Sequence, residues 1–126
     1  MREILFRGQQ ECDNEWVYGD LCHPNQPHTH LCIRTANGDS YNVIPETVGQ
    51  YIGVTDNDGT GIYEGDIVLY CYDSGNEIYE VIFDKDSCSF ILKEQNISSC
   101  ISDFTIKRLR VIGNKYDNEI LWQNIK

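Results

Sequence analysis

Short runs of β-forming residues alternate with clusters of turn formers along most of this chain. Before residue 115, no segment repeats apolar residues at the spacing of a helix over helical length. Runs rich in Val, Ile, Tyr and Phe that are bounded by Gly, Asn, Asp or Pro are typical of strands. The pattern therefore predicts a mainly β protein, a barrel or a sandwich. The predicted strands are 4–7, 16–22, 31–35, 41–44, 50–54, 62–63, 66–72, 78–83, 89–92 and 105–112.

Two turn segments stand out. Asn37-Gly38 favours a type I′ turn, which would pair residues 32–35 with residues 40–43. Residues 55–61, Thr-Asp-Asn-Asp-Gly-Thr-Gly, separate two further predicted strands. The polar tract 93–103 is predicted to be a loop, and 117–122 a short capped C-terminal helix.

Three blocks of the sequence carry a family resemblance. The central block is TVGQYIGVTDNDGTGIYEGDIV at 47–68, and the outer blocks are REILFRG at 2–8 with EWVYGDL at 15–21, and VIGNKYDNEIL at 111–121. In this order they resemble the YopX family of phage and prophage proteins. The resemblance implies a mainly β fold with an SH3-like portion and a phage or mobile-element setting. It brings no catalytic residues.

The domain organisation follows from the strand pattern and this resemblance together. A chain of 126 residues fits one domain or two small β-subdomains that share a core. We expect an N-terminal β-subdomain over 1–49 and an SH3-like β portion over 50–126, forming one compact unit.

Charge and composition limit the partners. The net charge of -10 repels the phosphate backbone, so nucleic-acid binding is not expected. A basic patch would have to come from Lys107, Arg108 and Arg110 with Lys115, and ordinary surface cations are the simpler interpretation. No apolar run approaches the roughly 20 residues of a membrane-spanning helix, and residues 1–6 contain no apolar core long enough for a secretory signal. We therefore expect a protein of the bacterial host cytoplasm, with its six Cys as reduced thiols.

The segment 22–32 contains all three His of the chain and two of its Cys. A hairpin centred on Asn25-Gln26 would place His23 opposite His28 and Cys32 opposite Gly19. Alternation would then put four metal ligands on one face, namely His23, His28, His30 and Cys32. Neutral imidazole and thiolate are zinc ligands. The alternative is a polar hairpin tip with incidental His, because a slip of one residue separates the set.

Signals of catalysis are weak. Asp56-Asn57-Asp58-Gly59 resembles part of a calcium-binding loop, but the first and last positions of that loop would be Val54 and Gly65, which offer no side-chain oxygen. Glu64 and Asp66 are better interpreted as parts of a turn. No phosphate-binding loop, dinucleotide fingerprint or nucleophile elbow occurs. We expect a protein that is not an enzyme and uses no cofactor.

The function expected from the sequence is that of a phage or prophage accessory protein which acts by binding. The partner would be a second copy of the chain, in a homo-oligomer, or a phage or host protein. Tyr and Trp residues near the strands suit such a surface. Two alternatives stay open: a nucleic-acid-binding SH3-like module, and a metal-dependent enzyme that uses the 22–32 cluster.

Overall fold

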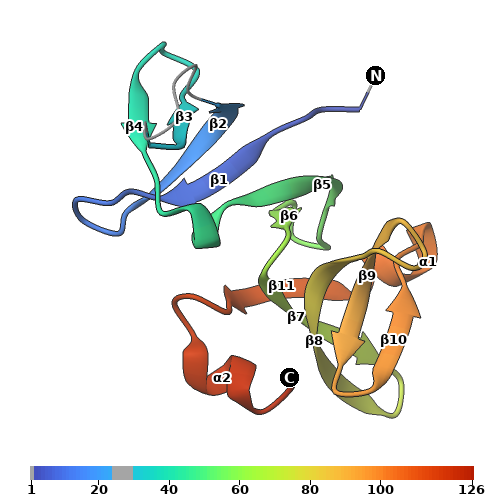
Figure 1. Ribbon diagram of the computed structural model, residues 1–126. Coiled ribbons are helices and arrows are strands. Elements are labelled where there is room, and N and C mark those ends of the chain that lie inside the picture. Colours follow the sequence, from blue (N-terminus) through green and yellow to red (C-terminus); the bar gives the residue numbers. More distant parts are fainter. Residues whose placement is uncertain (1, 24–29) are drawn as a thin grey trace. The chain divides into compact units, whose positions relative to one another are not determined.

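A computed structural model describes residues 2–23 and 30–126 (Figure 1). The chain forms two compact units, Met1–Tyr51 and Ile52–Lys126. Strands dominate both units, so the prediction of a mainly β protein is confirmed. In the described part of the chain, no helix is long and apolar enough to cross a bilayer.

The first sheet has the strand order β4-β3-β2-β1-β5-β6. Its pairing in the first unit is antiparallel, with Phe6 opposite Gly19 and Ile33 opposite Tyr41 as examples. Val17, Ile33 and Val43 form the buried core of this unit. The strands are β1 (Phe6–Gln9), β2 (Trp16–Cys22), β3 (Cys32–Arg34), β4 (Ser40–Asn42), β5 (Gly49–Thr55) and β6 (Gly61–Tyr63), and the 3-10 helix η1 (Pro45–Thr47) precedes β5.

The hairpin across Asn37-Gly38 is confirmed, but its predicted turn type is wrong. Thr35 donates its N–H to the Asp39 carbonyl, so three residues form the loop rather than two. Gly38 alone of these has a positive φ, of 92°. Such a loop shifts the strand register by one position, and Arg34 pairs with Ser40.

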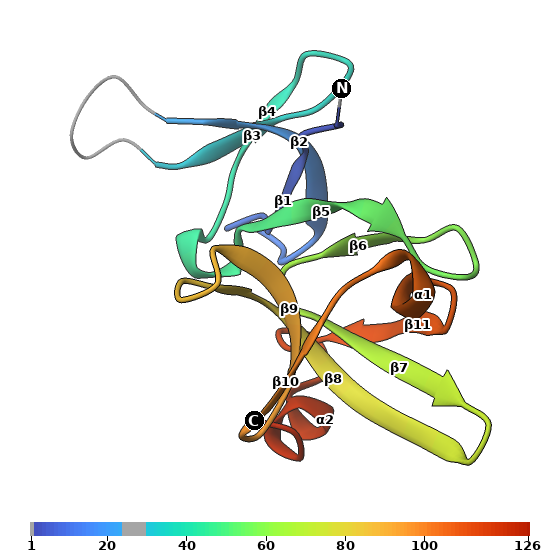
Figure 2. The same cartoon turned by 90° about the vertical axis from the view of Figure 1, so that its right-hand side faces the viewer.

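The second unit contains a five-stranded antiparallel meander, with the order β10-β9-β8-β7-β11 (Figure 2). The last strand returns to pair with the first, with a short helix before it, which is the strand order of an SH3-like barrel. The predicted SH3-like portion is therefore confirmed. The strands are β7 (Asp66–Tyr72), β8 (Gly75–Asp84), β9 (Ser89–Glu94), β10 (Ile97–Cys100) and β11 (Leu109–Asn114).

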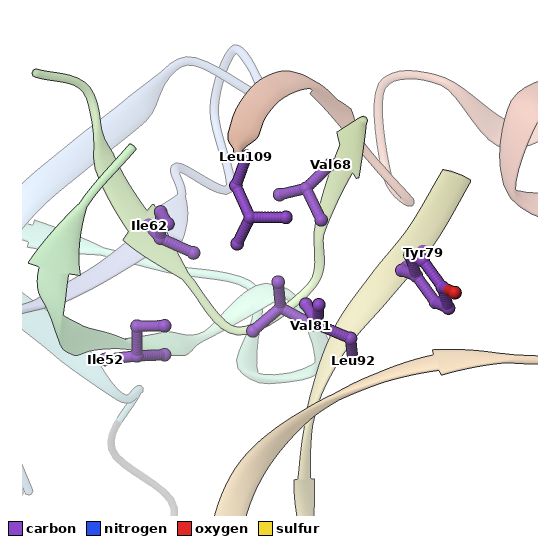
Figure 3. Close-up of a cluster of buried hydrophobic side chains, with 7 residues drawn as sticks. All are labelled: Ile52, Ile62, Val68, Tyr79, Val81, Leu92 and Leu109. Carbon is purple, nitrogen blue, oxygen red and sulfur yellow. The ribbon is translucent and has the colours of Figure 1, made fainter. Parts of the chain in front are cut away.

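One buried cluster holds the second unit together. It joins the end of β5 and β6 to the meander (Figure 3). Most of its members are β-branched or aromatic, the residue types that favour strands. The members are Ile52, Ile62, Val68, Tyr79, Val81, Leu92 and Leu109.

Two predictions for the second unit are wrong, and one is confirmed. The expected loop 93–103 contains the end of β9 and the whole of β10. The expected strand 105–112 begins instead with helix α1 (Asp103–Ile106), because Ser102 and Thr105 form a reciprocal capping box. The short C-terminal helix is present as α2 (Glu119–Gln123).

Candidate functional site

The predicted register of the 22–32 hairpin is wrong. Cys22 lies opposite Cys32, and Leu21 lies opposite Ile33. Ile33 is fully buried, so the apolar pair Leu21–Ile33 decides the register. Strand alternation then assigns His23 to the face opposite that of Cys32. The predicted one-face arrangement of ligands is not formed in this register.

The remaining His residues add no further metal ligand to Cys32 in the described part of the chain. His30 Nδ1 lies 2.6 Å from Glu11 Oε1, and both side chains are solvent-exposed. His28 lies outside the described residues. Within 2–23 and 30–126 there is no group of three or more potential ligands. A metal site at His23, His28, His30 and Cys32 stays a prediction.

The cations of the predicted basic patch are partly neutralised. Arg110 Nε lies 3.1 Å from Asp58 Oδ2, and Lys115 Nζ lies 3.5 Å from Glu80 Oε2. The Arg108 guanidinium stacks over the Phe104 ring at 4.8 Å. Because acidic groups accompany two of the four cations, the attraction of this surface for phosphate is weakened.

The carboxylate of Asp56 organises a turn. Its Oδ1 accepts hydrogen bonds from the N–H groups of Asp58 and Thr60, at 2.8 and 2.9 Å. Its Oδ2 accepts from the Val111 N–H of β11 at 2.8 Å. All the oxygen contacts of this buried carboxylate are thus with backbone donors, which is a structural role rather than that of a calcium ligand.

Asp66 has a similar role in the next turn. Its Oδ2 accepts from the Tyr63 N–H at 2.8 Å, and its side chain is almost fully buried. Gly65 has a φ of +87°, and its backbone bonds Val81 and Lys115. The interpretation of 64–66 as a turn is confirmed.

A polar cavity of about 540 Å³ opens beside Glu80 in the second unit. The Glu80 carboxylate already has two partners, since Trp122 Nε1 donates to Oε1 at 2.9 Å and Lys115 lies at Oε2. Lys93 and Lys126 also line the cavity. The buried carboxylate fixes helix α2 on the sheet and is not free to act on a ligand.

Three tyrosines and one carboxylate form a cluster on the meander. The hydroxyls of Tyr72 and Tyr79 both donate to Glu77. Burial and this hydrogen bond raise the pKa of Tyr79 to about 12. The Tyr70 ring packs edge-on against Tyr79, at 6.5 Å between centroids. A hydrogen bond with Ser99 of β10 acts on the pKa of Tyr79 in the opposite direction, which assigns Ser99 to the same face of the sheet as Tyr79.

The two edges of the meander differ. The outer edge of β11 is covered, because Asn57 donates to the Leu109 carbonyl and Val111 donates to Asp56. The outer edge of β10 has no strand partner among the described residues. From Gln95 to Ser102 the chain carries no charge and no proline, and Ile97 is 58% exposed. Sheet edges of this kind are open to pairing with another strand.

An apolar groove of about 260 Å³ lies next to the C-terminal end of β10. It lies where β10 leads into helix α1, beside the end of β5. The edge of β10 and this groove together form the surface that we call the β10 edge site. Ser102 and the charged Asp103 lie at the groove as well. The apolar side chains that line it are Ile52, Val54, Phe90, Ile101 and Ile106.

These features define a mainly β protein with an SH3-like unit, in which the buried carboxylates of Asp56 and Asp66 hold turns. The chain belongs to the YopX protein family, because the sequence model of that family matches residues 5–122. The matched range includes the turn residues Asp56, Gly65 and Asp66.

A solved structure shows the same fold. The crystal structure of protein EF1440 from Enterococcus faecalis is similar with a TM-score of 0.58 and 20% sequence identity, over 96% of this chain and 99% of that chain. A comparison with curated proteins finds no match.

The β10 edge site was missed by the sequence interpretation. The segment Ile97–Cys100 contains two Ser and one large apolar residue, and Gln95 takes a positive φ in the preceding turn. The available signal was the absence of charge over 95–102, which is unusual for an exposed loop in a chain with 24% charged residues.

Proposed function

We propose that this protein acts by self-association through the β10 edge site. In this proposal it is a non-enzymatic accessory protein of the bacterial cytoplasm, in the phage or prophage setting that the family resemblance implies. The observation that carries the proposal is the uncharged, unpaired edge of β10 in a chain of net charge -10. Two copies with this much like charge repel each other, so contact is favoured where charge is absent.

The sequence of β10 suits pairing with its own copy. A two-fold axis perpendicular to the sheet relates antiparallel edge strands, and residues that lie opposite then share a face. With Ser99 opposite Ser99 of the second copy, Ile97 lies opposite Ile101 and Ser98 lies opposite Cys100. No charged pair arises in this register. Both Ile residues lie on the same face of the sheet as Ser99.

The groove gives this register an apolar contact. Ile101 lines the groove, and the exposed Ile97 of the second copy would cover it. The same contact occurs twice, because a two-fold interface is isologous. An interface of one short strand and two small grooves buries little area, so the expected dimer is weak, with a dissociation constant that is roughly micromolar or higher.

Sedimentation velocity over a wide range of protein concentrations tests the proposal. The chain is expected to pass from monomer to dimer as concentration rises. Ile97→Lys places a cation opposite Ile101 and is expected to raise the dissociation constant at least about tenfold, since edge lysines oppose strand pairing. The matched control is Ile4→Lys, because Ile4 has a similar exposure, 55%, in the first unit.

Two results would contradict the proposal. One is a monomer at every concentration. The other is a dimer that Ile97→Lys and Ile4→Lys weaken equally. A hydrogen-exchange experiment locates the contact, because pairing should slow exchange of β10 backbone amides as the dimer forms.

A further inference from the structure

Cys22 and Cys32 are direct cross-strand neighbours. They form the last pair of the β2–β3 ladder, next to the core pair Leu21–Ile33. The Cys32 Sγ lies 3.8 Å from the Cys22 carbonyl oxygen. Both side chains are partly exposed, so a small reagent can reach them.

Cys32 lies between two neighbouring strands. Cys22 of β2 is its neighbour on one side, and the uncharged Asn42 of β4 is its neighbour on the other.

The remaining cysteines that lie in strands have other neighbours. Cys71 lies opposite Asn76, and Cys100 lies opposite Ile91. Cys12 and Cys88 are exposed residues outside the strands. The juxtaposition of two thiols on neighbouring strands therefore distinguishes Cys22 and Cys32.

We propose that Cys22 and Cys32 form a dithiol site which a low-molecular-weight disulfide converts to a cross-strand disulfide. Residues directly opposite on antiparallel strands have Cα atoms about 4.5–5.5 Å apart, which lies within the range that a disulfide bridges. The Cα separation expected for this pair therefore permits a disulfide.

The reaction balances as two thiol–disulfide exchanges. The thiolate of one cysteine attacks the small disulfide, releases one small thiol and forms a mixed disulfide. The second cysteine loses its proton to solvent and attacks the protein sulfur of this mixed disulfide. The Cys22–Cys32 bond forms and a second small thiol leaves. The protein is oxidised by two electrons, and the small disulfide is reduced to two thiols.

The consequence for the first unit is a covalent link beside its core. The link holds Leu21 and Ile33 in register, and Ile33 is fully buried against Val17 and Val43. Oxidation is therefore expected to raise the melting temperature of the first unit. It leaves the β10 edge site, in the second unit, chemically unchanged.

The test exposes the full-length reduced chain to oxidised glutathione and maps the cysteines by differential alkylation and mass spectrometry. The expected result is a peptide that carries the Cys22–Cys32 bond and is lighter by two hydrogen atoms than its reduced form. Cys22→Ser is expected to abolish the crosslink and leave a mixed disulfide with glutathione at Cys32. The control Cys71→Ser is expected to form the crosslink as the unchanged chain does.

Two results would overturn the proposal. One is glutathione attached separately to Cys22 and Cys32 with no crosslink between them. The other is a crosslink that forms at the same rate in 6 M guanidinium, where the native register is lost. The mapping uses the unchanged chain, so it remains decisive if Cys22→Ser does not fold.

Discussion

The carboxylate of Asp56 bonds the backbone N–H of Val111, across 55 positions of the sequence. Its other oxygen holds two N–H groups of its own turn. Removing a buried carboxylate leaves its donors unpaired, and hydrogen bonds to charged groups are worth roughly 1.5–3 kcal/mol each. Asp56→Ala is therefore expected to lower the free energy of unfolding by about 3 kcal/mol, as measured by denaturant titration.

Asp58→Ala is the control, because it removes only an exposed ion pair with Arg110 and should cost less than about 1 kcal/mol. Equal losses in the two variants would refute the role assigned to Asp56.

Substitutions at Gly65 and Gly38 distinguish the cost of backbone strain from the cost of steric crowding. Both have a positive φ, +87° and +92°. A Cβ at Gly65 would lie 3.2 Å from Tyr116 Cε2, whereas nothing lies within 4 Å of a Cβ at Gly38. Gly38→Ala is expected to cost about 1 kcal/mol from strain alone. Gly65→Ala should cost about 2 kcal/mol, because contact with Tyr116 is added to the strain. The comparison is made by thermal and denaturant unfolding, and a smaller cost at Gly65 would contradict it.

The raised pKa of Tyr79 predicts that the folded protein loses stability at high pH. Its pKa is about 12, above the ordinary value of 10, because burial and the Glu77 hydrogen bond disfavour the phenolate. A phenol whose folded-state pKa is raised stabilises the fold fully below the unfolded-state pKa. That contribution is lost as the pH rises from about 10 towards 12. The unchanged chain should therefore lose stability between pH 10 and 12 more steeply than Tyr79→Phe. Ultraviolet titration of the tyrosines should show a late component near pH 12 that Tyr79→Phe removes.

Trp122 links helix α2 to the sheet through Glu80. Its indole N–H donates to a carboxylate that is almost fully buried. Trp122→Phe keeps an aromatic ring but removes the donor, and is expected to cost about 1–2 kcal/mol of unfolding free energy. A double-mutant cycle with Glu80→Gln measures the coupling directly, and a value of about 1 kcal/mol is expected. A coupling near zero would mean that ring packing alone explains the effect.

The metal prediction is tested by elemental analysis. Protein purified without a histidine tag is expected to carry far less than one zinc per chain, because His30 is paired with Glu11 and Cys32 faces Cys22. His30→Ala should change the free energy of unfolding by no more than about 0.5 kcal/mol, as is usual for an exposed ion pair. Stoichiometric zinc and a melting temperature that falls with chelator would instead establish the site.

The β character, the SH3-like portion and the short C-terminal helix were predictable from strand spacing, turn residues and the family resemblance. The residues that were misplaced share a physical cause. The register at Cys22–Cys32 follows from the burial of Ile33, which local spacing does not reveal. Strand β10 exists because β9 pairs with it, and its own side chains give little β signal. Helix α1 starts at a capping box whose last member is Thr105 rather than Glu or Gln.

Strand β5 contributes residues to both units. Its first residues pair with β1, with Gly49 opposite Arg7, while Ile52 belongs to the core of the second unit. A genetic crossover within 49–55 would therefore divide a strand whose first residues pair with β1 and whose Ile52 belongs to the second core. Viable recombinants are therefore expected to inherit residues 49–55 unbroken, together with the other residues of the second unit's core from the same parent.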